Sequence, residues 1–135
     1  MLPRLILAGF LLAHASIHTG FLSARPRATA GAPPWPFELG HSWVLSPLGV
    51  QPDLGRMIGI ALVAATIGGF ALASVASLGL VPGPLWAPSV TLGAVASAAL
   101  LLLFFHPWLV VGLAIDAGLI WAAVGGFTPA GSAIG

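Results

Sequence analysis

The sequence predicts an all-α integral membrane protein in which four apolar helices form an antiparallel transmembrane bundle. Hydrophobic residues make up 59% of the 135 residues and charged residues only 5%, whereas a soluble domain carries roughly 25% charged residues. The apolar residues fall into four long segments, at residues 5–22, 57–81, 89–105 and 108–127. Because no further segment is long enough for a separate core, residues 1–135 are interpreted as a single membrane domain.

The composition excludes several classes of function. No cysteine is present, so the chain can form no disulfide, thiolate metal site or cysteine nucleophile. The net charge is only +1 and the basic residues form no cluster, so we expect no nucleic-acid partner. Phosphate-loop, dinucleotide-binding and serine-hydrolase motifs are missing. The composition therefore favours a non-enzymatic role in the lipid bilayer.

The first apolar segment, residues 5–22, has two interpretations. Arg4, the apolar run after it and the small residues at 13–15 are similar to a secretory signal peptide with its cleavage site. The apolar run continues beyond that site, however, and reaches about 18 residues, near the lower limit for crossing a bilayer. We therefore expect a first transmembrane helix.

Residues 23–55 form the one long connection, which is rich in proline and tryptophan. The prolines prevent a long helix, although a short interfacial helix is compatible with residues 37–45. Trp35, Phe37 and Trp43 are amphipathic anchors typical of the headgroup zone. Two interpretations stay open, because such a loop can fold back over the mouth of the bundle or contact lipid headgroups alone.

The other three segments are separated by short turns that contain proline. Residues 57–81 carry small residues at four-residue spacing, which lets helices approach closely, and the segment ends before Pro82. A single helix over residues 89–127 would be about 58 Å long, nearly twice the hydrocarbon thickness of about 30 Å. We therefore expect a hairpin with its corner at Pro107. Short turns make consecutive helices antiparallel.

Tryptophans and arginines predict how the bundle sits in the membrane. Four tryptophans at the ends of the predicted spans are expected to anchor it at the interfaces, namely Trp35, Trp43, Trp86 and Trp108. Three arginines lie on the side of the first loop and one on the other, these being Arg25, Arg27 and Arg56 against Arg4. The positive-inside rule then predicts a cytoplasmic first loop. The absence of lysine, asparagine and tyrosine is typical of a GC-rich bacterium, which predicts the bacterial inner membrane.

Ionisable residues inside the apolar segments indicate where a site lies, because they are costly in a membrane. His14 and His18 are four residues apart and so share one face of a helix. Counted from the loop side, His14 and Asp116 each lie about 12 Å into the bilayer. His106 lies at that rim and His41 in the loop above it. The topology therefore predicts that the first and fourth helices are adjacent and that these five side chains converge.

Three interpretations of this cluster stay open. His14 and Asp116 can form an interhelical hydrogen bond that only fixes the bundle, which is the interpretation we favour. The histidines can instead bind a metal, with His14, His18 and His106 as the ligands, or a haem or chlorin. They can also act as titratable steps in proton-coupled or small-solute transport. The residues themselves identify no particular cofactor.

Four short motifs carry a resemblance to a known group of proteins. They are the H-x3-H face of His14 and His18, the tryptophan-rich first loop, Gly55-Arg56 before the second span, and Pro107-Trp108 followed by Gly112 and Asp116. In this combination the chain resembles small, uncharacterised four-span bacterial membrane proteins, sometimes labelled permease-like. The resemblance implies four spans and no particular activity. We expect an accessory subunit that packs through its glycine and alanine faces against a second copy or a larger membrane complex.

Overall fold

The computed structural model describes residues 1–27, 30–31, 34–127 and 129, which contain helices and no strand. The helices are α1 (Leu2–Ile17), α2 (Pro52–Ser77), α3 (Trp86–Leu103) and α4 (Val110–Val124). Short 3₁₀ turns extend three of them, at His18–Leu22 after α1, Gly83–Leu85 before α3 and Pro107–Leu109 before α4. With these turns, all four are long and apolar enough to cross a membrane. The prediction of an all-helical chain with four membrane-length helices is therefore confirmed.

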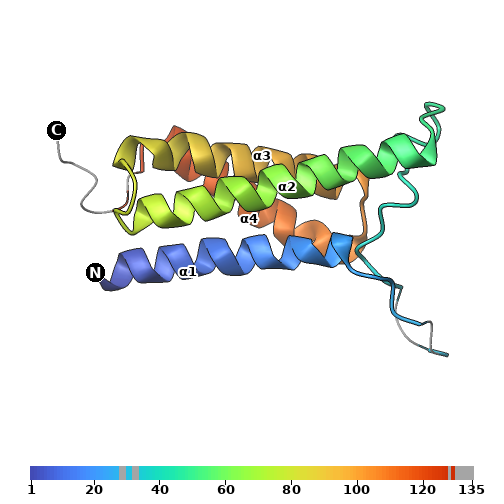
Figure 1. Ribbon diagram of the computed structural model, residues 1–135, viewed down its shortest axis with the longest axis horizontal. Helices are drawn as coiled ribbons and strands as arrows, with labels where there is room; N and C mark the ends of the chain where they lie inside the picture. The colour runs from blue at the N-terminus through green and yellow to red at the C-terminus, as the bar shows by residue number, and fades with distance from the viewer. Residues whose placement is uncertain (28–29, 32–33, 128, 130–135) are drawn as a thin grey trace.

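The four helices lie side by side, and consecutive helices run in opposite directions (Figure 1). The long first loop lies at one end of the molecule, and the start of α1 and the α2–α3 turn lie at the other (Figure 1). Helix α2 packs closely on α1 and on α3, and α3 packs closely on α4. Within the described chain, α1 and α4 are not among the closely packed pairs, so the seam between them is the loose one.

The second helix begins and ends earlier than predicted, and the backbone gives the reason. Pro52 stands in the first helical turn after an extended Gln51, where its missing N–H costs no hydrogen bond. At the other end, Gly79 adopts a φ of +75°, a conformation that favours glycine. The N–H of Leu80 then donates to the carbonyl of Val75, which closes the helix as a Schellman motif. The end predicted at residue 81 is wrong by four residues, because Gly79 acts before the prolines.

Trp86 is buried in the bundle, although it was expected to anchor the membrane interface. Helix α3 begins at this residue, three positions before the predicted start, and so turns the indole inward. Its side chain is only 1% exposed, so it offers no surface to lipid headgroups. Trp43 and Trp108, by contrast, are exposed and Trp35 is half-buried.

The first loop folds back onto the bundle, which settles the two alternatives left by the sequence. Ser42 Oγ donates to the carbonyl of Leu103, and Trp43 Nε1 donates to the carbonyl of Leu102 at 2.7 Å. These carbonyls belong to the last turn of α3, where no following helical N–H group is present to donate to them. Instead of an interfacial helix over residues 37–45, the structure has turns over residues 43–49.

The buried interior consists of two apolar clusters with polar side chains between them. The cluster far from the loop contains Leu11, Ala15, Phe70, Ala73, Ala76, Trp86, Val90, Ala94 and Leu119. The cluster near the loop contains Phe21, Leu39, Val63, Leu100, Leu101, Phe104 and Leu109. On α1, α3 and α4 alike, the residues that separate the two clusters are polar and buried. Their positions define the candidate site.

Helices α2 and α3 approach so closely that only glycine fits where they cross. A Cβ added to Gly69 would lie 2.6 Å from the backbone nitrogen of Gly93. Lipid provides no hydrophobic force between helices, so their association depends on van der Waals packing. Close backbone contact at glycine increases that packing. The α2–α3 pair is thus the closely packed side of the bundle, opposite in character to the loose α1–α4 seam.

Candidate functional site

Two histidines of the first span point into the bundle. Their four-residue spacing places both on one face of α1 and its 3₁₀ extension. His14 is 4% exposed and His18 2% exposed. Apolar residues on the opposite side of the helix, such as Leu5 and Leu12, are exposed and form the face available to lipid. The sequence therefore folds α1 with its polar pair toward the interior.

Asp116 of α4 is completely buried and is bonded on both carboxyl oxygens. Its Oδ1 lies 3.0 Å from Nε2 of His14, and its Oδ2 accepts a hydrogen bond of 2.6 Å from Oγ of Ser97 on α3. The contact between His14 and Asp116 is the one that equal depth in the bilayer predicts. One carboxyl group thereby connects three of the four helices.

His18 completes the cluster through the same serine. Its Nδ1 lies 3.0 Å from the backbone carbonyl oxygen of His14, and its Nε2 lies 2.8 Å from Oγ of Ser97. We call these four residues, His14, His18, Ser97 and Asp116, the polar cluster. A carbonyl oxygen can only accept, so Nδ1 of His18 must carry a hydrogen.

The hydrogen bonds of the polar cluster are compatible with two arrangements of its protons. In the first, Ser97 donates to Asp116 and accepts from Nε2 of His18, so both nitrogens of His18 carry hydrogens and the carboxyl group of Asp116 carries none. Moving one proton from His18 to Ser97, and that of Ser97 to Asp116, reverses both hydrogen bonds and leaves both groups neutral. Both arrangements contain the same protons. The cluster therefore has no net charge when His14 is neutral, as burial in an apolar bundle requires.

His14 retains one ring nitrogen without a partner. In the tautomer in which Nε2 donates to Asp116, Nδ1 of neutral His14 is a lone-pair acceptor, and it has no hydrogen-bond partner within the described chain. The ring contacts Phe70 in a T-shaped arrangement at 5.1 Å and lies parallel to that of Phe10 at 6.3 Å. A buried acceptor without a donor costs about 1–3 kcal/mol.

The structure joins three of the five expected side chains directly. His14, His18 and Asp116 meet, whereas His41 is exposed in the loop. His106 makes a local contact instead, because its Nδ1 accepts a hydrogen bond from the backbone nitrogen of Trp108. Ser97 was not expected, since in the sequence it is one of several small residues of the third span. Its signal was its place midway along that span, at the level of Asp116.

The histidine pair does not have the geometry of a metal centre. Three of its four ring nitrogens are occupied by Asp116, by the carbonyl of His14 and by Ser97. Among the residues that the structure describes, no group of three or more histidine, cysteine or acidic side chains is placed to hold a metal ion. Ligation by His14, His18 and His106 together is therefore not supported by their positions.

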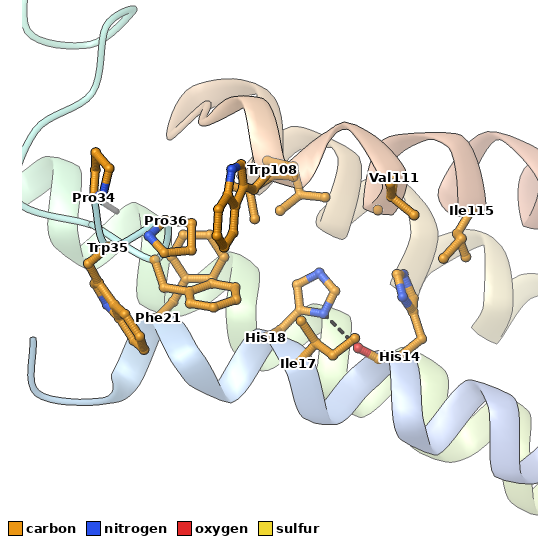
Figure 2. A pocket seen from close by; sticks show the side chains of 14 residues that line it. His14, Ile17, His18, Phe21, Pro34, Trp35, Pro36, Trp108, Val111 and Ile115 are labelled. Atoms are coloured by element: carbon orange, nitrogen blue, oxygen red, sulfur yellow. Dashed lines mark hydrogen bonds between the residues drawn. The ribbon is translucent and has the colours of Figure 1, made fainter. Parts of the chain in front are cut away.

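A cavity of about 420 Å³ lies beside the polar cluster, in the loose seam between α1 and α4 (Figure 2). Its volume lies within the range of about 300–1,000 Å³ that is usual for small-molecule sites. Two of its lining residues, His14 and His18, are polar cluster members. The others are apolar or aromatic and come from α1, the loop, α3 and α4, namely Ile17, Phe21, Pro34, Trp35, Pro36, Phe37, Leu101, Trp108, Leu109, Val111, Gly112 and Ile115.

The fold and the polar cluster define a multi-pass integral membrane protein with a buried histidine–aspartate pair. Comparison of the chain with protein-family models, with curated proteins and with solved structures found no match. Its function must therefore be inferred from its own geometry.

Replacing Asp116 separates the hydrogen-bond pattern from the charge. We expect Asp116→Ala to lower the free energy of unfolding by about 1–3 kcal/mol, because it leaves Nε2 of His14 without a partner and removes one of the two hydrogen bonds of Ser97. Asp116→Asn should cost less than about 1 kcal/mol. Its amide NH₂ can donate to Ser97, Ser97 to His18, and its oxygen still accepts from His14. Thermal melting in detergent, followed by helical circular dichroism, checks this order, and equal losses for both variants would contradict it.

Proposed function

We propose that this protein is a small non-enzymatic subunit of the bacterial inner membrane that associates through α4 with a second copy or with a larger membrane complex. In this proposal its helices cross the bilayer as an antiparallel four-helix bundle. The observation that carries it is the exposure of α4, in which only Asp116 and Leu119 are buried. A membrane helix held by so little of its surface has most of that surface free for another helix.

The exposed side of α4 has the composition of a helix-packing surface. Ala114, Ala117 and Gly118 are small and exposed, and a Cβ added to Gly118 would meet nothing within 4 Å. Trp121 lies one turn further on and is 79% exposed. Small residues let a partner backbone approach closely, and a tryptophan beside them supplies a large contact area. This surface supports association better than simple contact with lipid tails.

The polar cluster supports a structural role rather than transport. Its members donate to and accept from one another, so they connect α1 to α3 and α4. Apolar side chains flank the cluster on both sides along the helices. Apart from the two histidines, the cavity beside it is also lined by apolar residues, which do not favour the passage of an ion.

Association is tested by replacing one of two exposed glycines, one on α4 and a matched control on α1. Gly118 of α4 and Gly9 of α1 are both exposed, and an added Cβ meets nothing at either position. The native mass of the protein, extracted from its membranes in a mild detergent, should exceed that of the 13.6 kDa chain. Gly118→Leu should reduce it to the monomer, and Gly9→Leu should not. A monomeric wild type, or equal effects of both changes, would refute the proposal.

The loop end of the bundle is proposed to face the cytoplasm, because Arg25, Arg27 and Arg56 lie there. The chain has no cysteine, so single cysteines report on each side cleanly. Leu48 in the loop is 74% exposed and Leu80 at the opposite end is 71% exposed. In intact cells, a membrane-impermeant maleimide should label Leu80→Cys but reach Leu48→Cys only after lysis. The reverse pattern would place the loop outside.

A further inference from the structure

The cavity in the α1–α4 seam opens between the exposed surfaces of two membrane-length helices. Ile17 on α1, Trp108 in the turn before α4 and Val111 on α4 line it, and their side chains are 55%, 64% and 64% exposed. All three belong to membrane-length helices, so their exposed surface is available to lipid. Figure 2 shows the loop residues Trp35 and Pro36 at one end of the cavity and His14 at the other. An occupant would therefore enter from the membrane, between α1 and α4.

The lining selects an uncharged, flat molecule. Phe21, Trp35, Phe37 and Trp108 supply aromatic surface, and Phe37 contacts both Phe21 and Trp35 in T-shaped pairs. Among the described residues that line the cavity, none is acidic, lysine or arginine, so a charged group would lack a counter-ion there. Aromatic rings pack favourably against such walls. A cavity of about 150 Å³ accommodates benzene, and this one, at about 420 Å³, has room for two fused rings with substituents.

Two buried polar atoms of the lining have no partner within the described chain, Nε1 of Trp35 and Nδ1 of His14, and the second sets the polar group of the occupant. His18 uses both ring nitrogens inside the polar cluster, whereas His14 uses only Nε2. His14 lines the cavity and is only 4% exposed. Its Nδ1 is buried and has no hydrogen-bond partner within the described chain. With Nε2 donating to Asp116, Nδ1 requires a donor from outside the chain. A hydroxyl group provides one and carries no charge.

We propose that the cavity binds a lipid-soluble phenol, with its hydroxyl group donating to Nδ1 of His14 and its ring between Trp108 and Ile115. The apolar substituents of such a molecule leave through the seam into the bilayer. The polar cluster holds the His14 ring in the tautomer and orientation that this contact needs, because Asp116 fixes its Nε2 hydrogen. The proposal concerns binding alone and involves no electron or proton transfer. It does not depend on the association proposed for α4.

The test compares 2-naphthol with naphthalene, which has the same rings and no hydroxyl. Calorimetric titration uses purified protein in lipid nanodiscs, with protein-free nanodiscs as the blank. We expect 2-naphthol to bind about tenfold more tightly than naphthalene, the advantage that one buried hydrogen bond gives. Equal affinities for the two probes, or no binding of either, would overturn the proposal.

Three variants locate the contact. His14→Phe keeps a ring at this position but removes both ring nitrogens, so the preference for 2-naphthol should disappear while naphthalene still binds. His41→Gln, an exposed histidine of the loop, should leave both affinities unchanged. Ile115→Trp fills the cavity from α4 and should abolish binding of both probes. Retention of the preference in His14→Phe, or of binding in Ile115→Trp, would overturn the proposal.

The natural source of the phenol is distinguished by competition. A prenylated hydroquinone and 4-nonylphenol both carry the required hydroxyl on a ring with an apolar tail. The stronger competitor of 2-naphthol identifies an isoprenoid quinol or a phenolic lipid as the source. Failure of both to displace 2-naphthol would show that the cavity cannot take a tailed phenol from the bilayer, and the proposal would be wrong.

Discussion

The structure depends on how one carboxyl group is accommodated inside an apolar bundle. Placing an aspartate at the centre of a membrane helix costs about 2.5–3.5 kcal/mol on insertion scales. Asp116 is 0% exposed, so that cost is offset only by His14 and Ser97, which occupy its two oxygens. His18 completes the proton balance through Ser97. Charge neutrality, rather than the strength of any one bond, is the condition that this arrangement meets.

This requirement also explains the shape of the bundle. Helices α2 and α3 cross at Gly69 and Gly93, where their backbones touch. Helix α1 has no comparable contact with α4, and the hydrogen bond from His14 to Asp116 spans the seam between them. A hydrogen bond between two side chains holds the helices apart by the length of those side chains. This separation is larger than that of helices whose backbones touch at glycine. The space left beside the bridge, toward the loop, is the cavity.

Much of the fold and part of the site could be predicted from the sequence. Four spans followed from the length and composition of the apolar segments, and the pairing of His14 with Asp116 followed from their equal distances to the loop side. Ser97 could not be identified, because a serine in a small-residue stretch packs equally well without a partner. The inward position of Trp86 depended on where α3 begins, which is three residues earlier than the composition of the apolar segment indicated. The spacing of residues along the sequence predicts how deep a side chain lies in the membrane. It does not predict which face of a helix lies at the loosely packed seam.

The most direct test of this account is a double-mutant cycle on the two residues that bridge the seam. Free energies of unfolding would be measured for His14→Ala, for Asp116→Ala and for the double variant, with Ser77→Ala as a second partner for Asp116. Ser77 bonds within its own helix and shares no partner with the polar cluster. We expect the double variant of the bridge to lose at least about 1 kcal/mol less than the sum of the single losses, while the control pair is additive. Additive losses for His14 and Asp116 would contradict it, because the bridge would then not hold α1 to α4.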